Sequence, residues 1–337
     1  MKTNTEFSIR FWGVRGSHPV SGDCFNRFGG NTSCVEIQAG GYTLIFDAGT
    51  GIINLGRDLV RRSMEGGRPI HATLFFSHLH HDHTQGFPFF APAFIPTTTM
   101  NIFVPDMYDQ SADKILADVM ASPMFPVSFQ RMGSTKRLHN LNQNEIVVLG
   151  NSPNEISVQT ASSFDPKEEI VTVRTMQSYG HPQGVMLYRV SWRGRSVVYA
   201  TDTEGYVNGD QRVVNFSRNA DILIHDAQYT DDHYIGKRAG APPTQGYGHS
   251  TAAMACQTAR AAKVGQLILF HHDPNYEDAN LQGIEASARK HFPNTLAARQ
   301  GQEIILRERA SRPKPRGVVS VPQVTRKSEQ VGEWASS

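Results

Sequence analysis

The chain has 337 residues, of which 39% are hydrophobic and 19% are charged, and its net charge is +2. These values are ordinary for a soluble globular protein with a sizeable core. A membrane-spanning protein is excluded by the lengths of the apolar runs, because none approaches the roughly 18 residues that a bilayer helix needs. The N-terminal stretch MKTNTEFSIRFWG lacks the apolar segment of a secretion signal, and the three cysteines suggest no disulfide framework. We therefore expect a cytoplasmic protein with no membrane partner.

The charge is distributed unevenly along the chain. Residues 307–337 carry seven Lys or Arg and three Asp or Glu, which leaves 26 basic and 28 acidic residues in the rest. A nearly neutral body argues against a large nonspecific contact with nucleic acid, which usually shows as a basic face. Residues 308–337 are rich in Pro, Ser and charge and have no periodicity. We predict a disordered basic tail there, after a folded domain over residues 1–307.

The first part of the chain alternates short apolar runs with turns. The runs FSIRFWG, SCVEIQAG and YTLIFDAG predict three successive strands, and AGGY predicts a hairpin between the last two. Residues 52–62 predict a helix with Leu55, Leu59 and Val60 on one face. The run HATLFF then predicts a buried strand.

The pattern changes over residues 91–144, which we interpret as an insertion rich in Met and Phe. Its stretch SADKILADVMASPMFPVSF predicts an amphipathic helix followed by Met, Phe and Pro residues. Flexible Met and flat aromatic side chains suit a lid, or a wall contributed by a dimer partner, that stacks a nucleobase. Extra core is the alternative for each of the residues concerned, which are Met107, Tyr108, Met120, Met124, Phe125 and Phe129.

The second half again supplies strands before helices. The runs IVTVRTMQS, VMLYRVSW, SVVYATD, ADILIHDA and QLILFHH predict strands, and helices are predicted over residues 250–263 and 278–292. In both halves the chemically suggestive residues fall at strand ends, where open α/β folds bind ligands. We therefore predict an α/β sandwich of two sheets flanked by helices, with the site at one rim.

The most informative motif follows the buried run TLFF. His78, His80, Asp82 and His83 form the pattern H-x-H-x-D-H. On an extended backbone His78 and His80 point the same way and can bind one ion, whereas Asp82 and His83 lie past a turn and can reach a second. Imidazole and carboxylate suit zinc or another borderline divalent metal. A His-rich surface loop is the alternative, which the preceding buried strand disfavours; we give His81 no role.

A pair of metals needs further ligands, and strand ends supply them. His181 lies in SYGHP, Asp202 follows VVYA as a candidate bridge between two ions, and His271 and His272 follow LILF. Alone, each would more often be structural than functional. Together with the first motif they give a complete set for two metals, five histidines and two aspartates.

This pattern resembles that of the metallo-β-lactamase superfamily of binuclear metallohydrolases, over about residues 7–307. The resemblance implies a four-layer αββα sandwich, a catalytic domain over residues 1–307 and two zinc ions, with manganese or iron as alternatives. The resemblance implies that Asp82 is both a metal ligand and a catalytic residue. It also implies that Asp47, in LIFDAGTG, holds the metal-binding loop in place.

One branch of the superfamily resembles the chain further. The stretch HSTAAMACQTARAAKVGQLILFHH is similar to the final segment of tRNase Z-like phosphodiesterases. That similarity implies that His271 rather than His272 is the last ligand. It also implies that His249 is the general acid for the leaving oxygen, with Asp226, in place of a glutamate, orienting its ring.

The expected substrate follows from a departure from tRNase Z. That family places its tRNA-clamping arm between the third metal histidine and the bridging aspartate, but Asp202 follows His181 by only 21 positions. The opening RFWGVRGSHPVSG resembles bacterial members similar to cyclic-nucleotide phosphodiesterases. We therefore expect a homodimeric binuclear zinc phosphodiesterase that converts a small phosphodiester, a 3′,5′-cyclic nucleotide, to the 5′-monophosphate, and no large RNA substrate.

Several alternatives stay open at this point. A tRNase Z-like ribonuclease without the arm and a hydrolase of another ester class share the metal set. A metal-dependent nucleotide-binding sensor would keep the ligands but lack an acid, so His249 and Asp226 weigh against it. Asn31, Thr32 and Ser33, in GGNTSC, could contact a substrate phosphate or form a turn into the next strand.

Overall fold

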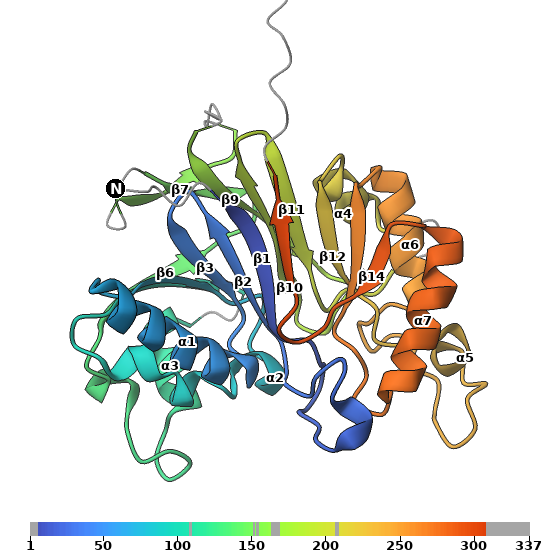
Figure 1. Ribbon diagram of the computed structural model, residues 1–337, viewed down its shortest axis with the longest axis horizontal. Helices are drawn as coiled ribbons and strands as arrows, with labels where there is room; N and C mark the ends of the chain where they lie inside the picture. The colour runs from blue at the N-terminus through green and yellow to red at the C-terminus, as the bar shows by residue number, and fades with distance from the viewer. Residues whose placement is uncertain are drawn as a thin grey trace, which may run out of the picture.

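Two β-sheets pack face to face at the centre of the fold, with helices on both outer faces (Figure 1). The structure is a computed structural model that describes residues 6–107, 110–150, 152, 155–162, 169–205 and 209–307. The predicted tail over residues 308–337 lies outside the described residues.

The first sheet has seven strands within the described residues. In spatial order they are β15 (Glu303–Leu306), β1 (Phe7–Gly13), β2 (Cys34–Ala39), β3 (Tyr42–Phe46), β4 (His71–Phe75), β5 (Thr99–Pro105) and β6 (Thr135–Leu141). The second sheet has eight. They are β14 (Thr295–Ala297), β13 (Gln266–Phe270), β12 (Ile222–Asp226), β11 (Arg195–Ala200), β10 (Val185–Trp192), β9 (Val171–Ser178), β7 (Glu145–Leu149) and β8 (Ile156–Thr160).

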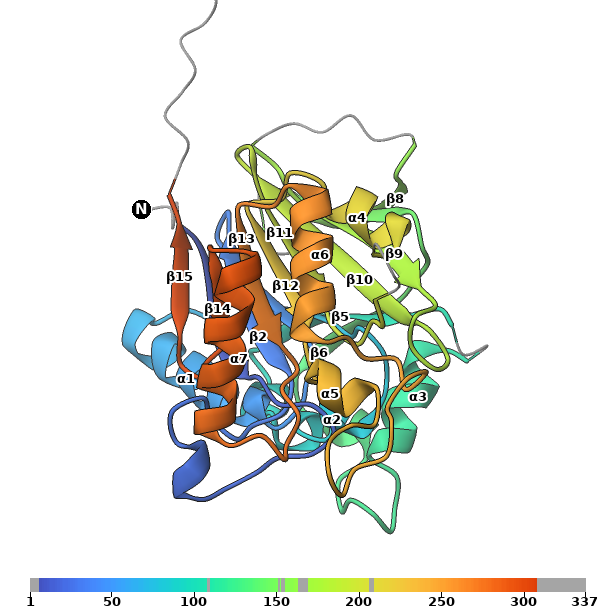
Figure 2. The same cartoon turned by 90° about the vertical axis from the view of Figure 1, so that its right-hand side faces the viewer.

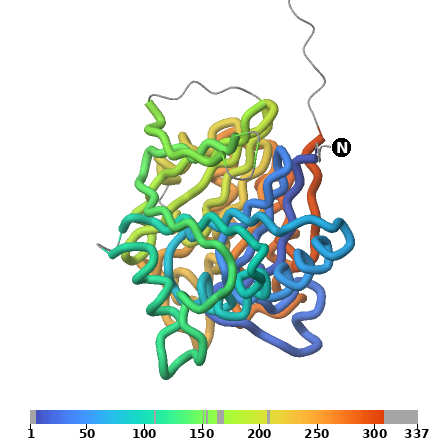
Figure 3. Tube along the Cα trace, turned by 90° about the vertical axis from the view of Figure 1, so that its left-hand side faces the viewer, coloured from blue at the N-terminus to red at the C-terminus, as the bar shows by residue number. Residues whose placement is uncertain are grey.

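Helices cover the outer face of each sheet. Seen from one side, α6 and α7 lie against the second sheet (Figure 2), and from the opposite side the chain around α1 covers the first (Figure 3). The α-helices are α1 (Gly51–Gly66), α2 (His81–Thr84), α3 (Ala112–Val119), α4 (Gln211–Ser217), α5 (Asp231–Tyr234), α6 (Ala252–Ala262) and α7 (Asp278–His291). Short 3₁₀ turns are η1 (Asp23–Phe25), η2 (Phe87–Phe89), η3 (Ala91–Phe94) and η4 (Phe129–Arg131). The predicted αββα sandwich is confirmed.

Aromatic side chains fill the space between the sheets. Phe46 and Phe75 stack with ring centroids 5.2 Å apart, and Tyr188 and Tyr199 of the second sheet pack on Phe46. Each fully buried aromatic side chain contributes about 1.5–3 kcal/mol through burial. On the outer side of the first sheet, Leu55 of α1 packs into a separate apolar cluster. Three apolar layers thus alternate with two sheets and fix their stacking.

The parallel strands bring the predicted site residues to one edge of the two sheets. Strands β3 to β6 run parallel in the first sheet, as do β11 to β14 in the second. The segments that leave the carboxyl ends of β3, β4, β11, β12 and β13 meet at this rim. Every predicted metal residue of the second half, apart from His181 after β9, belongs to one of these segments.

The Met- and Phe-rich segment over residues 91–144 is partly integral to the first sheet, since β5 and β6 belong to it. Met120 and Phe129 are buried in the cluster beneath α1, whereas Met124 is exposed. Met120 and Phe129 therefore contribute to the hydrophobic core. Tyr108 lies outside the described residues. No helix in the described ranges is long and apolar enough to cross a bilayer.

Candidate metal and catalytic site

The H-x-H-x-D-H motif begins where β4 ends. After Phe75 and Phe76, both buried, the chain bends at Ser77, is extended at His80 and then turns into α2, which carries Asp82 and His83. The imidazole rings of His78 and His80 lie 4.5 Å apart, and those of His78 and His83 lie 4.3 Å apart. The change from strand to helical turn thus directs all four side chains of the motif to one place.

Three histidines form the first cluster, in which His181 joins His78 and His80. His80 Nδ1 lies 3.1 Å from His181 Nε2. His78 Nε2 is buried and has no hydrogen-bond partner. Burial lowers the pKa of His181 to about 4, so its ring is neutral and keeps a lone pair for a ligand.

Two carboxylates and two histidines form the second cluster, made of Asp82, His83, Asp202 and His271. Asp82 Oδ2 lies 3.0 Å from His271 Nε2 and 3.3 Å from His83 Nε2. The two imidazole Nε2 atoms are 3.2 Å apart. Burial acts against the Asp82 carboxylate, but the neighbouring His83 and His271 outweigh it and keep the pKa of Asp82 well below the usual range.

Asp202 belongs to the second cluster and also faces the first. Its Oδ1 is 3.3 Å from His83 Nε2, and its Oδ2 is 3.3 Å from His271 Nε2. The same Oδ2 is 3.7 Å from His78 Nε2 and 3.9 Å from His181 Nε2. One carboxylate therefore faces the nitrogen atoms of both clusters, as a bridging ligand must.

The residues at these strand ends have an uncommon backbone conformation. Asp47, Asp202 and His271 have φ of 63°, 47° and 61°, in the left-handed region that favours glycine. Such positions cost about 1–3 kcal/mol each and persist where the surroundings enforce them. Here each one turns a side chain out of a buried strand and into the site.

Asp47 is hydrogen-bonded to His83 of the motif and to Ser77, the residue that precedes the motif. Its Oδ1 accepts the backbone N–H of Ser77 at 2.7 Å. Its Oδ2 accepts from the Ser77 hydroxyl, the Tyr199 hydroxyl and His83 Nδ1, all at 2.7–2.8 Å. Asp47 is fully buried and lies in neither cluster. It therefore orients a candidate ligand rather than serving as one.

His249 and Asp226 form a hydrogen-bonded pair beside these two clusters, and with Asp202 and His271 they make up a third group of side chains that could hold a cation. His249 Nδ1 lies 2.8 Å from Asp226 Oδ2, and the His249 ring stacks on that of His271 with centroids 5.0 Å apart. Burial disfavours the charged ring, but the Asp226 charge and hydrogen bond outweigh it and raise the pKa of His249. The arrangement places a proton donor next to the candidate metal ligands.

The donor set fits a pair of divalent cations. Ligands about 2.1 Å from a tetrahedral zinc ion lie about 3.4 Å apart. Ligand atoms in the second cluster are separated by 3.0–3.3 Å, and the unpartnered His78 Nε2 faces the first cluster. Nitrogen and oxygen donors without thiolate suit zinc, manganese or iron. The geometry therefore permits the cofactors expected from the sequence.

Other predicted residues have structural contacts. His272 Nε2 donates to the carbonyl of Ala298 at 3.0 Å, away from both clusters, so His271 alone enters the site. Thr32 and Ser33 are buried. Thr32 Oγ1 accepts the backbone N–H of Thr50, and Asn31 Oδ1 accepts its hydroxyl. This geometry matches the turn alternative and gives no support to their predicted substrate contact.

Two residues at the site were not predicted. Gln228 contacts His271 at 3.0 Å, and the backbone N–H of Ser17 donates to Asp82 Oδ2 at 2.7 Å. Neither belongs to a recognisable ligand type. The only available signal is position, since Gln228 follows Asp226 in HDAQ and Ser17 follows the first strand.

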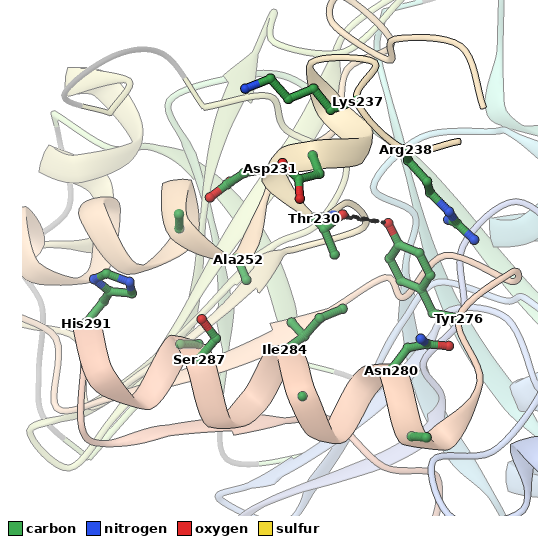
Figure 4. Close-up of a pocket in the computed structure, with 15 residues that line it drawn as sticks. Thr230, Asp231, Lys237, Arg238, Ala252, Tyr276, Asn280, Ile284, Ser287 and His291 are labelled. Atoms are coloured by element: carbon green, nitrogen blue, oxygen red, sulfur yellow. Dashed lines mark hydrogen bonds between the residues drawn. The ribbon is translucent and has the colours of Figure 1, made fainter. Parts of the chain in front are cut away.

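A cavity of about 780 Å³ lies outside the metal clusters, between α7 and the segment around α5 (Figure 4). Tyr276 lines this cavity, and its hydroxyl oxygen is hydrogen-bonded to His233 Nδ1 at 2.9 Å. Its walls carry both Asp231 and Arg238. No candidate metal ligand lines this cavity, so it is separate from the candidate metal site.

The fold and the clusters of candidate metal ligands together define a metal-dependent hydrolase of the αββα type. Residues 42–272 match the family of β-lactamase superfamily domains, which is more than half of the chain. The chain therefore belongs to the metallo-β-lactamase superfamily.

The curated relatives include several ribonucleases Z. The ribonuclease Z of Picrophilus torridus is 26% identical over 310 residues, which are 84% of this chain and 91% of that protein. The ribonuclease Z of Thermoplasma acidophilum is 34% identical over 117 residues, 35% of this chain, and the match spans 34% of that protein. The crystal structure of the short form of human tRNase Z is similar with a TM-score of 0.57 and 19% identity, covering 88% of this chain and 98% of that one. At that identity the likeness bears on the fold alone.

Proposed function

We propose that the chain is a binuclear phosphodiesterase of the ribonuclease Z type that hydrolyses a phosphodiester bond of RNA. The observation that carries this proposal is the His249–Asp226 pair, stacked on the candidate ligand His271. An ester with a poor leaving group, such as a ribose hydroxyl, needs a proton donor at this place. The ribonuclease Z relatives support RNA as the substrate class.

We assign one cation to the first cluster and one to the second, with Asp202 between them. The residues that would hold them are His78, His80 and His181, then Asp82, His83 and His271. Cations of this class activate a water molecule and offset charge on the phosphoryl oxygens. Zinc is our first choice because the ligands are nitrogen and oxygen in compact clusters.

The chain's own residues would supply positioning and proton transfer. Asp226 accepts the His249 Nδ1–H, which leaves Nε2 to carry the proton for the departing oxygen. Gly248 places its carbonyl 3.1 Å from His181 Nδ1, and Glu204 accepts the Gly248 backbone N–H at 3.0 Å. The loop that carries the acid is therefore tied to a candidate metal ligand.

A second candidate function is hydrolysis of a small phosphodiester. It is favoured by the short interval between His181 and Asp202, where β10 and β11 leave no place for a tRNA-clamping arm. The expected cyclic-nucleotide substrate belongs to this class, but none of the named relatives supports it. A non-phosphate ester hydrolase or a sensor has no need of the His249–Asp226 pair. The predicted homodimer and the single domain over residues 1–307 stay predictions.

A substrate panel separates the two candidates. We expect the zinc-loaded full chain to cleave a tRNA precursor with a 3′ trailer, or a single-stranded RNA, at least about tenfold faster in kcat/KM than any cyclic mono- or dinucleotide, a difference of about 1.4 kcal/mol. Product lengths on a sequencing gel and chromatography of the nucleotides measure both. A preference for a cyclic nucleotide would overturn the RNA proposal, and no cleavage of any phosphodiester would overturn both.

A further inference from the structure

Most candidate histidine ligands have their second ring nitrogen fixed by a neighbour. In three of them Nδ1 points away from its cluster and lies 2.8–3.1 Å from an oxygen atom. The pairs are His83 with the Asp47 carboxylate, His181 with the Gly248 carbonyl, and His78 with the Ser77 hydroxyl. Such an acceptor holds the proton on Nδ1 and keeps the Nε2 lone pair free for a metal.

His271 has the same need, and a neutral amide meets it. Its Nε2 lies 3.0 Å from Asp82 Oδ2 and 3.3 Å from Asp202 Oδ2, so this nitrogen faces the cluster. Its Nδ1 lies 3.0 Å from Gln228 Oε1. Asp226 Oδ2 is 3.5 Å from the same Nδ1, but that oxygen already accepts from His249 at 2.8 Å. Gln228 is therefore the acceptor available to His271.

The Gln228 amide is itself held in one orientation. Its Nε2 lies 3.2 Å from the Ser17 hydroxyl and 3.3 Å from the Tyr229 hydroxyl, and both oxygens can accept. Its backbone N–H donates to Asp226 Oδ1 at 3.2 Å. The side chain is buried, with 2% of the residue exposed. The amide oxygen is thus directed at His271.

Ser17 connects this contact to a second candidate ligand. Its backbone N–H donates to Asp82 Oδ2 at 2.7 Å, while its hydroxyl contacts Gln228. The preceding Gly16 lies so close to His271 that a Cβ atom there would come within 2.4 Å of the imidazole ring. The loop after β1 therefore packs directly on the His271 ring and cannot bear a larger residue without moving it.

We propose that Gln228 is a positioning residue for the second metal cluster. It fixes His271 in the Nδ1–H tautomer and fixes the direction of its Nε2, and Ser17 couples this orientation to Asp82. The proposal rests on the proposed metal site, and it is independent of the substrate. Outer contacts of this kind typically change metal affinity by about 10–100-fold when they are removed.

Metal affinity of Gln228 variants tests the proposal. Gln228→Met keeps the length of the side chain but has no oxygen acceptor, whereas Gln228→Glu keeps one. We expect Gln228→Met to bind one of two zinc ions about 10–100-fold more weakly than the unaltered protein, in competition with a chromophoric chelator. Gln228→Glu should stay within a few fold of the unaltered protein.

The matched control is Gln266→Met, at the opposite end of β13, the strand that leads to His271. It should bind both ions as the unaltered protein does. Thermal unfolding of the metal-free proteins shows whether Gln228→Met folds, and cobalt absorption spectra report the ligand field of the weakened site. Unchanged zinc affinity in Gln228→Met, or an equal loss in Gln228→Met and Gln228→Glu, would overturn the positioning role. Failure of the unaltered protein to bind two ions would instead overturn the proposed function.

Discussion

Replacing His249 with alanine is expected to lower kcat on an RNA phosphodiester by about 10²–10⁴-fold, the usual contribution of a general acid. The physical reason is that a ribose alkoxide is a poor leaving group, so the oxygen must be protonated as it departs. His249 belongs to neither of the two clusters to which we assign cations, and we assign it the role of an acid although it also lies in a third group with Asp202, Asp226 and His271. Metal content measured by mass spectrometry should therefore be unchanged.

A substrate with a different leaving group shows whether His249 acts as a general acid or has only a structural role. With bis(p-nitrophenyl) phosphate the leaving phenolate needs little protonation, so His249→Ala should lose much less activity on this ester than on RNA. His81→Ala is a matched control, since His81 belongs to the same motif as the ligands but is exposed. Equal losses on both esters would show that His249 does not protonate the leaving oxygen.

Replacing Asp202 with asparagine is expected to reduce the zinc content from two ions per chain to one or fewer. Asp202 faces nitrogen atoms of both clusters at 3.3–3.9 Å, and an amide offers one neutral oxygen where the carboxylate offers two charged ones. Turnover should fall by more than about 100-fold, which is the largest loss expected when a residue that only contacts a ligand is removed. Equilibrium dialysis and initial rates measure the two effects.

The control for this variant is Asp106→Asn, an exposed carboxylate that accepts a hydrogen bond from Asn140. It should retain both ions and full activity. Far-UV circular dichroism of both variants checks that the fold is kept. Retention of two ions with unaltered affinity in Asp202→Asn would contradict the bridging assignment.

The fold and most of the site could be predicted because they depend on local patterns. Short apolar runs predicted the strands, and ionisable residues one or two positions after buried runs predicted His78, Asp202 and His271. Parallel strands then bring their ends to one rim. The choice between His271 and His272 came from the resemblance; in the structure His271 lies in the second cluster, and His272 bonds to Ala298.

The remaining features depend on contacts that no local pattern encodes. Gln228 and Ser17 are ordinary polar residues, and their parts follow from distances to His271 and Asp82 across more than 40 positions of sequence. The apolar residues of the segment over residues 91–144 divide between core and surface because β5 and β6 join the first sheet. Substrate choice depends on surfaces beyond the ligands, which explains why the ligand motif alone did not separate RNA from a cyclic nucleotide.

The central claim is that distant parts of the chain converge to hold two cations. Anomalous diffraction at the zinc edge, from crystals of the full chain grown with zinc, tests it most directly. We predict two peaks per chain, one among His78, His80 and His181 and the other among Asp82, His83 and His271, with Asp202 contacting both. A single peak, or zinc bound only elsewhere on the protein, would contradict the binuclear site.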